Sequence, residues 1–395
     1  MRVRDGRTGH DGPVTRTSPP APLPGPTRSP LRGVWTAVGA FAAIRALGLL
    51  VLALWSRAAG TDAHALLSAR WDSLWYARVV ESGYDFTLTA PDGRVLSDLA
   101  FFPLLPWLER ALSAVTPLGP GDAGLVVSAL AGLFAAWGMY LLGHHLYGHR
   151  AGLLLVVLWA AVPVGIVQSM AYSEALFAAL SAWALYAVLR RRWIEAGLLA
   201  SLAGLTRPVG LAVAAALWAA AAVEARRTRR ADARMLTGAV LAPLGAAGYV
   251  LWVGARRGSP LAYLDVQAEW GNGFDGGLAY GKFIVAHLGG WSVAPAGLGL
   301  VAGTALALWA YVLCVRGRQP LPLLVFTGIV MALALCSSGY FGSKPRLLLS
   351  AFPLLLPAAL ALSRVRAARA VAVVAVLAAG SAVYGASWLN GSGPP

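Results

Sequence analysis

The residue of this sequence best suited to chemistry is an aspartate set among aromatic residues. Asp72 is the acidic residue of the segment 70–76. The segment 70–80 has apolar side chains three and four apart, which predicts a short helix lying along a membrane surface. There Asp72 could act as a general base beside a lipid headgroup, although a carboxylate that only complements the helix dipole is the simpler alternative. The aromatic residues that we expect at the same site are Trp71, Trp75, Tyr76 and Tyr84.

A second carboxylate follows a serine between two apolar stretches. An acidic residue at membrane depth is costly and marks a candidate functional site, so Glu174 is a candidate substrate ligand. In the alternative interpretation Ser173 caps a helix and Glu174, in its first turn, complements the dipole. The sequence leaves both interpretations open.

Three basic residues are candidates for binding the phosphate of a donor. Arg207 precedes a proline where two short apolar segments meet, and Lys344 and Arg346 stand just before another apolar segment. A guanidinium can bind phosphate through two parallel hydrogen bonds. The alternative is contact with the phosphates of membrane lipids, and it applies more to Lys344 and Arg346 than to Arg207. Arg45, inside the first apolar run, requires a buried carboxylate or carbonyl as its partner.

The composition predicts an all-α polytopic membrane protein. Of the 395 residues 58% are hydrophobic and 12% are charged, against about 25% charged in soluble domains. Apolar runs of roughly 20 residues recur along the chain, and about 11 of them could form transmembrane helices. The expected spans lie near residues 34–56, 122–143, 151–170, 174–190, 193–206, 208–224, 236–255, 293–315, 320–337, 347–363 and 370–389.

The distribution of charge predicts the orientation and the domain organisation. The net charge is +15, but the basic residues cluster in short segments between apolar runs, as in cytoplasmic loops, so nucleic acid is not an expected partner. With a cytoplasmic N-terminus, the segments 57–121 and 256–291 lie outside the cell membrane, and they are rich in carboxylates and aromatic residues. The first would carry short amphipathic helices. We expect a disordered basic, proline-rich tail over 1–33, one transmembrane domain over 34–389 and a short tail over 390–395.

The sequence contains no recognisable metal or nucleotide site. His145 and His149 are four residues apart but lack the glutamate of a zinc-binding helix, so these two and His144 are expected to face headgroups. Cys314 and Cys336 both fall inside predicted spans, which argues against a disulfide framework or a cysteine-based metal site. A requirement for a divalent cation stays open. No phosphate-binding glycine motif is present, so a nucleotide sugar has no visible binding loop.

Several of these segments, taken in order, resemble one family. They are Trp71 to Tyr76 with Gly83-Tyr84, Ala100 to Pro106, Tyr172 to Phe177, Thr206 to Gly210, and Pro345-Arg346 with Phe352-Pro353. The set resembles the PIG-V-type family, the GPI mannosyltransferase II enzymes and their bacterial relatives, and the matches span about residues 34 to 365.

The resemblance implies a GT-C glycosyltransferase fold with an extracytoplasmic active site. It implies transfer of a sugar, mannose in the family, from a polyprenyl-phosphate donor. It implies that the acidic side chain of Asp72 is the catalytic base and that Arg207 and Arg346 contact the phosphate. The composition is typical of a high-GC bacterium, so the acceptor is expected to be another glycolipid, polymer or protein and not a GPI lipid.

The alternative function is a transporter or lipid flippase. Such a protein needs polar residues along a path through its spans. The predicted spans hold few, mainly Arg45, Gln168 and Glu174. The acidic and aromatic residues concentrate in the outer segments, which favours chemistry on membrane lipids. A non-catalytic scaffold is a third hypothesis.

Overall fold

The computed structural model describes residues 30–289, 294–391 and 393, most of which lie in helices. Residues 1–29, which carry most of the predicted N-terminal tail, lie outside this part of the chain. The first helix begins at Pro30, ahead of the predicted start at residue 34. The last long helix ends at Leu389, where the predicted domain ends.

The protein is a multi-pass membrane protein. Within the described residues, six segments are long and apolar enough to cross a membrane, or up to eight if each of two bent helix pairs counts as one span. The six are α1 (Pro30–Ala59), α5 (Pro120–Tyr147), η3 (Pro208–Gly210) with α9 (Leu211–Thr228), α10 (Ala233–Leu241) with α11 (Leu244–Arg257), α14 (Ala294–Arg316) and α18 (Ala367–Leu389).

The bent pairs and the shorter helices account for the rest of the predicted spans. One pair is α6 (His149–Ala160) with η2 (Pro163–Ser169), bent by 85°. The other joins η4 (Phe341–Ser343) and α16 (Lys344–Leu348) to η5 (Phe352–Leu355) and α17 (Leu356–Ser363), bent by 72°. The remaining three predicted spans coincide with helices of 10–17 residues, which are α7 (Glu174–Leu189), α8 (Trp193–Gly204) and α15 (Leu321–Cys336). By length the structure therefore supports fewer full spans than the eleven predicted.

The bend after α6 explains the arginine inside the first span. Pro163 begins η2 and cannot donate a backbone hydrogen bond, which frees carbonyl groups at the bend. The Arg45 guanidinium of α1 donates to the carbonyl oxygens of Ala160 and Gly165. Of the two possible partners expected for Arg45, a buried carboxylate or a carbonyl group, the structure shows carbonyl groups.

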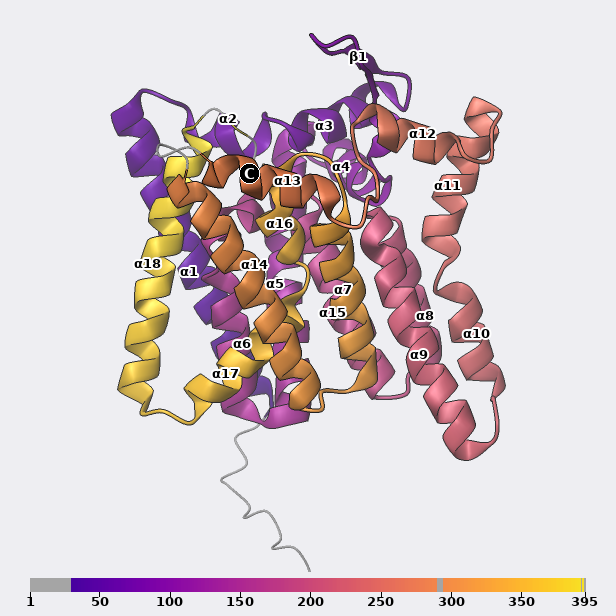
Figure 1. Cartoon of the computed structure of the whole chain (residues 1–395), viewed down its shortest axis with the longest axis vertical. Coiled ribbons are helices and arrows are strands. Elements are labelled where there is room, and N and C mark those ends of the chain that lie inside the picture. Colours follow the sequence, from indigo (N-terminus) through magenta and orange to yellow (C-terminus); the bar gives the residue numbers. More distant parts are fainter. Residues whose placement is uncertain (1–29, 290–293, 392, 394–395) are drawn as a thin grey trace, which may run out of the picture.

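The two long outer segments fold together at one end of the bundle (Figure 1). The first contains α2 (Ala63–Ser68), α3 (Asp72–Ser82), the antiparallel strands β1 (Thr87–Thr89) and β2 (Val95–Ser97), η1 (Asp98–Ala100) and α4 (Leu104–Val115). The second contains α12 (Ala262–Glu269) and α13 (Leu278–Leu288). The predicted short helices of the first segment are confirmed, with α3 starting at Asp72 and not at residue 70.

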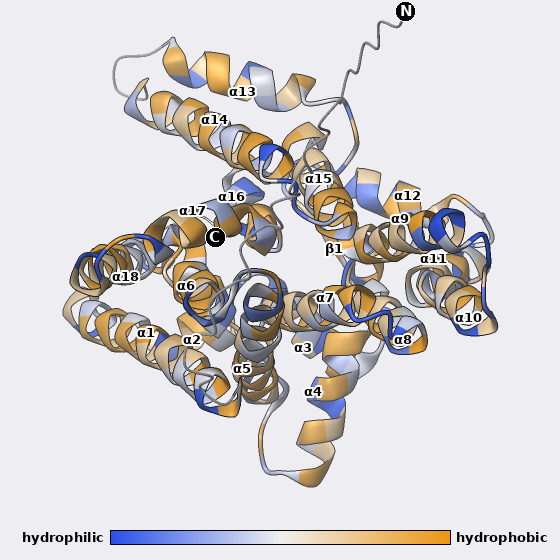
Figure 2. Cartoon of the chain, turned by 90° about the horizontal axis from the view of Figure 1, so that it is seen from below, coloured by the Kyte–Doolittle hydropathy of each residue, from blue (hydrophilic) through white to orange (hydrophobic). Residues whose placement is uncertain are grey.

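The bundle is built around α5, α6 and α7. Trp159, Tyr140 and Phe177 are among its largest fully buried side chains. The helices α5 and α6 approach closely because both contribute glycine at the contact: a Cβ on Gly143 would lie 2.8 Å from the Cα of Gly152. Seen along the bundle, hydrophobic residues dominate the long helices, and α13 and α14 lie at its edge (Figure 2).

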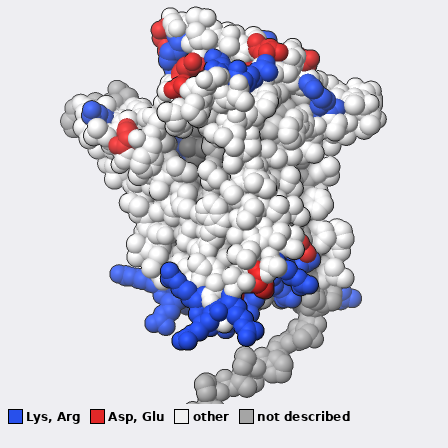
Figure 3. Space-filling view, turned by 90° about the vertical axis from the view of Figure 1, so that its right-hand side faces the viewer, with Lys and Arg blue, Asp and Glu red and all other residues white. Residues whose placement is uncertain are grey.

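Charge divides between the two ends of the bundle. Four connections between helices turn at the end opposite the outer helices (Figure 1). They are α7–α8 (residues 190–192), α9–α10 (229–232), α14–α15 (317–320) and α17–α18 (364–366). Lys and Arg dominate this end in the face shown in Figure 3, whereas acidic and basic residues mix at the other. We call these the basic end and the outer end.

Candidate functional site

Four charged side chains from distant parts of the chain meet at the outer end. Nη2 of Arg346 lies 2.8 Å from Oδ2 of Asp72, and its Nε lies 3.1 Å from Oε1 of Glu174. Nη1 of Arg207 lies 2.5 Å from the same oxygen of Glu174. Each of these residues is a candidate from the sequence, but their mutual contacts are a structural finding. We call the four residues the ion-pair cluster.

Helix ends position the members of the cluster. Asp72 is the first residue of α3 and Glu174 the first of α7, so both carboxylates lie at the positive ends of helix dipoles. Arg346 belongs to the short helix α16, and Arg207 is an extended residue between α8 and η3. Ser173 occupies the N-cap position of α7, as one of the two open interpretations has it, but its side chain makes no capping hydrogen bond and instead accepts one of 3.0 Å from the Tyr76 hydroxyl.

Burial differs strongly within the cluster. The exposed fractions of the side chains are 2% for Glu174, 10% for Arg346, 13% for Arg207 and 26% for Asp72. Buried charges are tolerated when opposite charges neutralise them. Two carboxylates and two guanidinium groups achieve that balance here. Glu174 is the buried centre, and Asp72 is the member most open to solvent.

Aromatic side chains surround the cluster. The Tyr172 ring lies 5.1 Å from Cζ of Arg346, a cation–π distance. Trp75 stacks on Phe101 at 5.6 Å and meets Trp270 edge-on at 4.9 Å, which joins the two outer segments. Burial and then the charge of Asp72 raise the pKa of Tyr76 above its ordinary value, so this hydroxyl stays a hydrogen-bond donor.

Backbone strain lies directly before the candidate base. Trp71 has a φ of 52°, a conformation that non-glycine residues rarely adopt and that costs roughly 1–3 kcal/mol. Its neighbour Arg70 lies with Cζ 4.1 Å from the Trp71 ring. Such strain concentrates at functional sites. Here it sets the turn from which α3 begins at Asp72.

Two of the predicted ligands make contacts outside the ion-pair cluster. The Tyr84 hydroxyl donates to the carbonyl of Phe101 at 2.9 Å. Lys344 is buried, and its Nζ donates to the carbonyl of Ser337 and lies 5.3 Å from the Tyr280 ring. Their roles as substrate ligands stay predictions.

Two aromatic residues beside the site were not among the candidate ligands chosen from the sequence. Tyr172 forms the aromatic wall behind Arg346, and within the described residues its buried hydroxyl has no hydrogen-bond partner. Trp270 packs on Trp75 although almost 200 residues separate them in the sequence. The tyrosine directly before Ser173 and Glu174 was a usable signal, because it precedes a candidate carboxylate. Nothing in the sequence indicated that Trp270 would contact Trp75.

Histidines and cysteines do not form a metal centre in the described part of the chain. No group of three or more His, Cys, Asp or Glu side chains there is arranged to hold a metal ion. His149 contacts the Tyr140 hydroxyl at 2.8 Å, and the His144 ring stacks on Tyr140. Of the three histidines expected to face headgroups, His145 is exposed while His144 and His149 are partly buried.

A further buried carboxyl group belongs to α4. Glu109 is buried, and its Oε1 occupies the space beside Gly124, where a Cβ would lie 2.5 Å away. That Cβ would also lie 2.8 Å from the Cβ of Ala171, which directly precedes Tyr172. Burial raises the pKa of the Glu109 carboxyl from 4.5 to about 8.

Glu109 should make the stability of the protein depend on pH. The folded state keeps this proton to a higher pH than the unfolded state, so stability falls as the pH rises from 4.5 to about 8. Each pKa unit corresponds to about 1.4 kcal/mol. We expect Glu109→Gln and wild type to melt at similar temperatures at pH 5, and the variant to melt several degrees higher at pH 8.5. Melting curves in detergent from pH 5 to 9 test this, and parallel profiles would contradict it.

Comparisons with known proteins bear on the fold. The family model for dolichyl-phosphate-mannose-protein mannosyltransferases matches residues 101–252, less than half of the chain. The matched range includes Glu174 and Arg207 and excludes Asp72 and Arg346. No curated protein matches the chain.

Solved structures match over more of the chain. ArnT from Cupriavidus metallidurans bound to undecaprenyl phosphate has a TM-score of 0.55 at 15% identity, covering 85% of this chain and 62% of that one. The oligosaccharyltransferase AglB from Archaeoglobus fulgidus, with an inhibitory peptide and a dolichol-phosphate, has a TM-score of 0.47 at 17% identity, covering 90% and 56%. The chain thus spans less than two thirds of the length of either protein. The likeness to ArnT confirms the predicted fold: the chain is folded like a GT-C membrane glycosyltransferase.

Proposed function

We propose that this protein is a membrane glycosyltransferase that moves a sugar from a polyprenyl-phosphate donor to a glycolipid, polymer or protein acceptor. The observation that carries the proposal is the ion-pair cluster, which combines the candidate base Asp72 with the guanidinium groups of Arg207 and Arg346. The GT-C fold and the undecaprenyl phosphate named with the ArnT structure support it. Mannose as the sugar is proposed from the PIG-V-type motifs.

The cluster supplies the groups that an inverting transfer needs. A carboxylate oxygen of Asp72 would accept the proton of the acceptor hydroxyl as that oxygen attacks the anomeric carbon. The bond between this carbon and the phosphate oxygen breaks, and the phosphate keeps the electron pair. Arg207 and Arg346 would stabilise the charge that develops on the departing phosphate.

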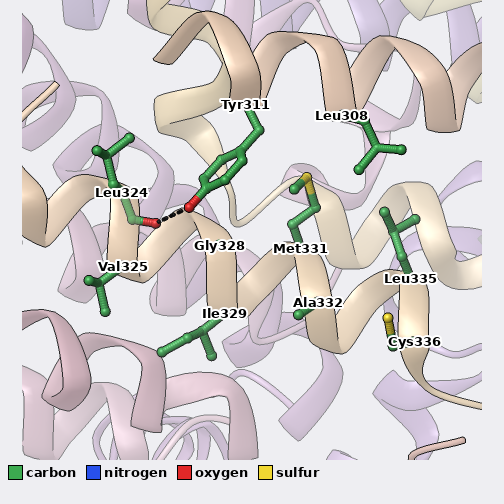
Figure 4. Close-up of a pocket in the computed structure, with 10 residues that line it drawn as sticks. All are labelled: Leu308, Tyr311, Leu324, Val325, Gly328, Ile329, Met331, Ala332, Leu335 and Cys336. Atoms are coloured by element: carbon green, nitrogen blue, oxygen red, sulfur yellow. Dashed lines mark hydrogen bonds between the residues drawn. The ribbon is translucent and has the colours of Figure 1, made fainter. Parts of the chain in front are cut away.

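A groove between α14 and α15 offers a place for the lipid part of the donor (Figure 4). Its volume is about 550 Å³, and most of its lining side chains are apolar, among them Leu308, Met331 and Leu335. The groove extends to Cys336, and the next residue, Ser337, accepts hydrogen bonds from Lys344. A polyprenyl chain in this groove would have its phosphate end near Lys344, one of the two residues for which the sequence predicts phosphate binding.

We propose that the outer end faces away from the cytoplasm in the cell membrane. The basic end is rich in arginine in short connections, which is the pattern of cytoplasmic loops. The donor, the acceptor and the surrounding lipids would then all meet the ion-pair cluster at the outer surface.

The structure gives the transporter hypothesis little support. The three polar residues singled out in the predicted spans, Arg45, Gln168 and Glu174, each have a partner within the described residues. Arg45 donates to two carbonyls, and Nε2 of Gln168 donates to the carbonyl of Trp159 at 2.9 Å. Glu174 is neutralised by Arg207 and Arg346.

The proposal predicts transfer from a lipid-linked sugar. Purified protein in nanodiscs would receive radiolabelled polyprenyl-phosphate mannose and a lipid extract of its host, with and without EDTA. We expect label in a new lipid or polymer, and the EDTA sample shows whether the reaction requires a divalent cation. Other polyprenyl-linked sugars would test the choice of mannose, and a nucleotide sugar serves as the control donor. Transfer from the nucleotide sugar alone would contradict the proposal.

Replacing Arg207 should weaken the use of the donor. Arg207→Ala removes one of two guanidinium groups facing the phosphate, and loss of one such donor typically lowers the rate about 10²–10³-fold. The matched control is Arg94→Ala, because Arg94 is exposed at the outer end and pairs with Asp92. Initial rates against donor concentration measure the effect. An unchanged donor dependence in Arg207→Ala would assign this arginine a structural role.

A further inference from the structure

The ion-pair cluster is closed on itself in this structure. Oδ2 of Asp72 faces Nη2 of Arg346 at 2.8 Å. An oxygen engaged in this way is not available to the hydroxyl group of an acceptor. The residue best placed to act as base is therefore held by the residue best placed to bind the donor phosphate.

The two carboxylates differ in how firmly they are held. Glu174 is buried and contacts both Arg207 and Arg346. Asp72 contacts one guanidinium group, has an exposed fraction of 26% and lies on the surface helix α3. Leaving its arginine for solvent costs a charged group less when that group is already partly exposed. Of the two, Asp72 is thus the carboxylate that an incoming anion can displace.

The guanidinium groups have hydrogen-bonding capacity left for a ligand. Within the described residues, Arg207 turns Nη1 toward Glu174, whereas Arg346 turns Nε toward Glu174 and Nη2 toward Asp72, so displacing Asp72 frees a donor of Arg346. A guanidinium has five N–H donors, and a phosphate accepts two of them in parallel. Because Glu174 holds both arginines, one phosphate could contact both.

We propose that the phosphate of the polyprenyl donor replaces Asp72 on Arg346, and that this exchange frees Asp72 to act as the base. The inference rests on the proposed function and adds an order to it: the donor binds first, and the acceptor finds a competent base only afterwards. The phosphodiester of the donor carries one negative charge, so charge on the arginines stays balanced. Glu174 is then a positioning residue that keeps the two guanidinium groups together.

Binding of a sugar-free polyprenyl phosphate tests this exchange. Undecaprenyl phosphate would be titrated into wild type, Asp72→Asn and Arg346→Ala in nanodiscs, where transfer cannot occur. Asp72→Asn removes the competing charge, so we expect it to bind about tenfold more tightly than wild type, or about 1.4 kcal/mol. Asp85→Asn is the matched control, because Asp85 lies in the same outer segment as Asp72 and also pairs with an arginine, Arg256. The affinity of this variant for undecaprenyl phosphate should equal that of wild type. Arg346→Ala should lose binding.

The outcomes separate the inference from the proposed function. Equal or weaker binding by Asp72→Asn, with binding lost in Arg346→Ala, would overturn the exchange and leave the donor class standing. Absence of binding in wild type and Asp72→Asn alike would overturn both. Isotope trapping provides a test without variants: wild type preincubated with labelled donor should carry the label into product when extract and excess unlabelled donor are added. Failure to trap label would contradict donor-first binding.

Discussion

Asp72→Asn is expected to abolish sugar transfer while the protein stays folded. The amide keeps the shape of the side chain but cannot take a proton from the acceptor, and general base catalysis contributes about 10²–10⁴-fold to a rate. The fold should tolerate the change because Asp72 is partly exposed and Arg346 keeps Glu174 as a partner.

The measurement for Asp72→Asn is the turnover rate in nanodiscs, accompanied by the melting temperature. Asp85→Asn is the control, since it also removes an outer carboxylate that pairs with an arginine. We expect transfer to fall at least about 100-fold in Asp72→Asn and to be unchanged in Asp85→Asn. Turnover of Asp72→Asn at the wild-type rate would remove Asp72 from the catalytic role.

Arg346→Ala is expected to lower both stability and donor use. The change leaves Asp72 without its guanidinium partner and Glu174 with only one. Removing one partner of a buried pair costs about 3–5 kcal/mol. The same change removes a phosphate-binding group, which should lower the transfer rate about 10²–10³-fold.

Arg346→Lys separates charge from geometry. Lysine keeps the positive charge but cannot make two parallel hydrogen bonds. We expect its melting temperature and its donor KM to lie between those of wild type and Arg346→Ala. An Arg346→Ala variant with wild-type stability and donor KM would show that the ion-pair cluster neither supports the fold nor binds the donor.

The sequence predicted the parts of the site better than their assembly. Asp72, Glu174, Arg207 and Arg346 all emerged as candidates because charged residues beside apolar runs are rare and informative. Their contacts could not be predicted, because they come from four distant segments and depend on how the helices tilt and bend. The bend of 72° that follows α16 does not follow from the hydrophobic pattern.

Local rules failed where tertiary contacts competed with them. Ser173 has the chemistry of a helix cap, yet it accepts a hydrogen bond from Tyr76, which lies in another element. The contacts of Lys344 with Ser337 and two aromatic rings were likewise not predicted, while its role in binding phosphate stays a prediction. The predicted number of transmembrane spans exceeds the number of helices long enough to cross a membrane, because α7, α8 and α15 are shorter than full spans. Hydropathy alone does not reveal helix length.

The most direct test of the proposed function is the stoichiometry between sugar transferred and lipid phosphate released. Mass spectrometry of a nanodisc reaction would count polyprenyl phosphate formed from the polyprenyl-phosphate sugar, and the radiolabel would count sugar in the acceptor. We predict one polyprenyl phosphate for each sugar transferred in wild type, and neither product in Asp72→Asn. Absence of polyprenyl phosphate in nanodiscs, together with movement of the intact donor across the bilayer of proteoliposomes, would contradict the proposed function and identify the protein as a transporter.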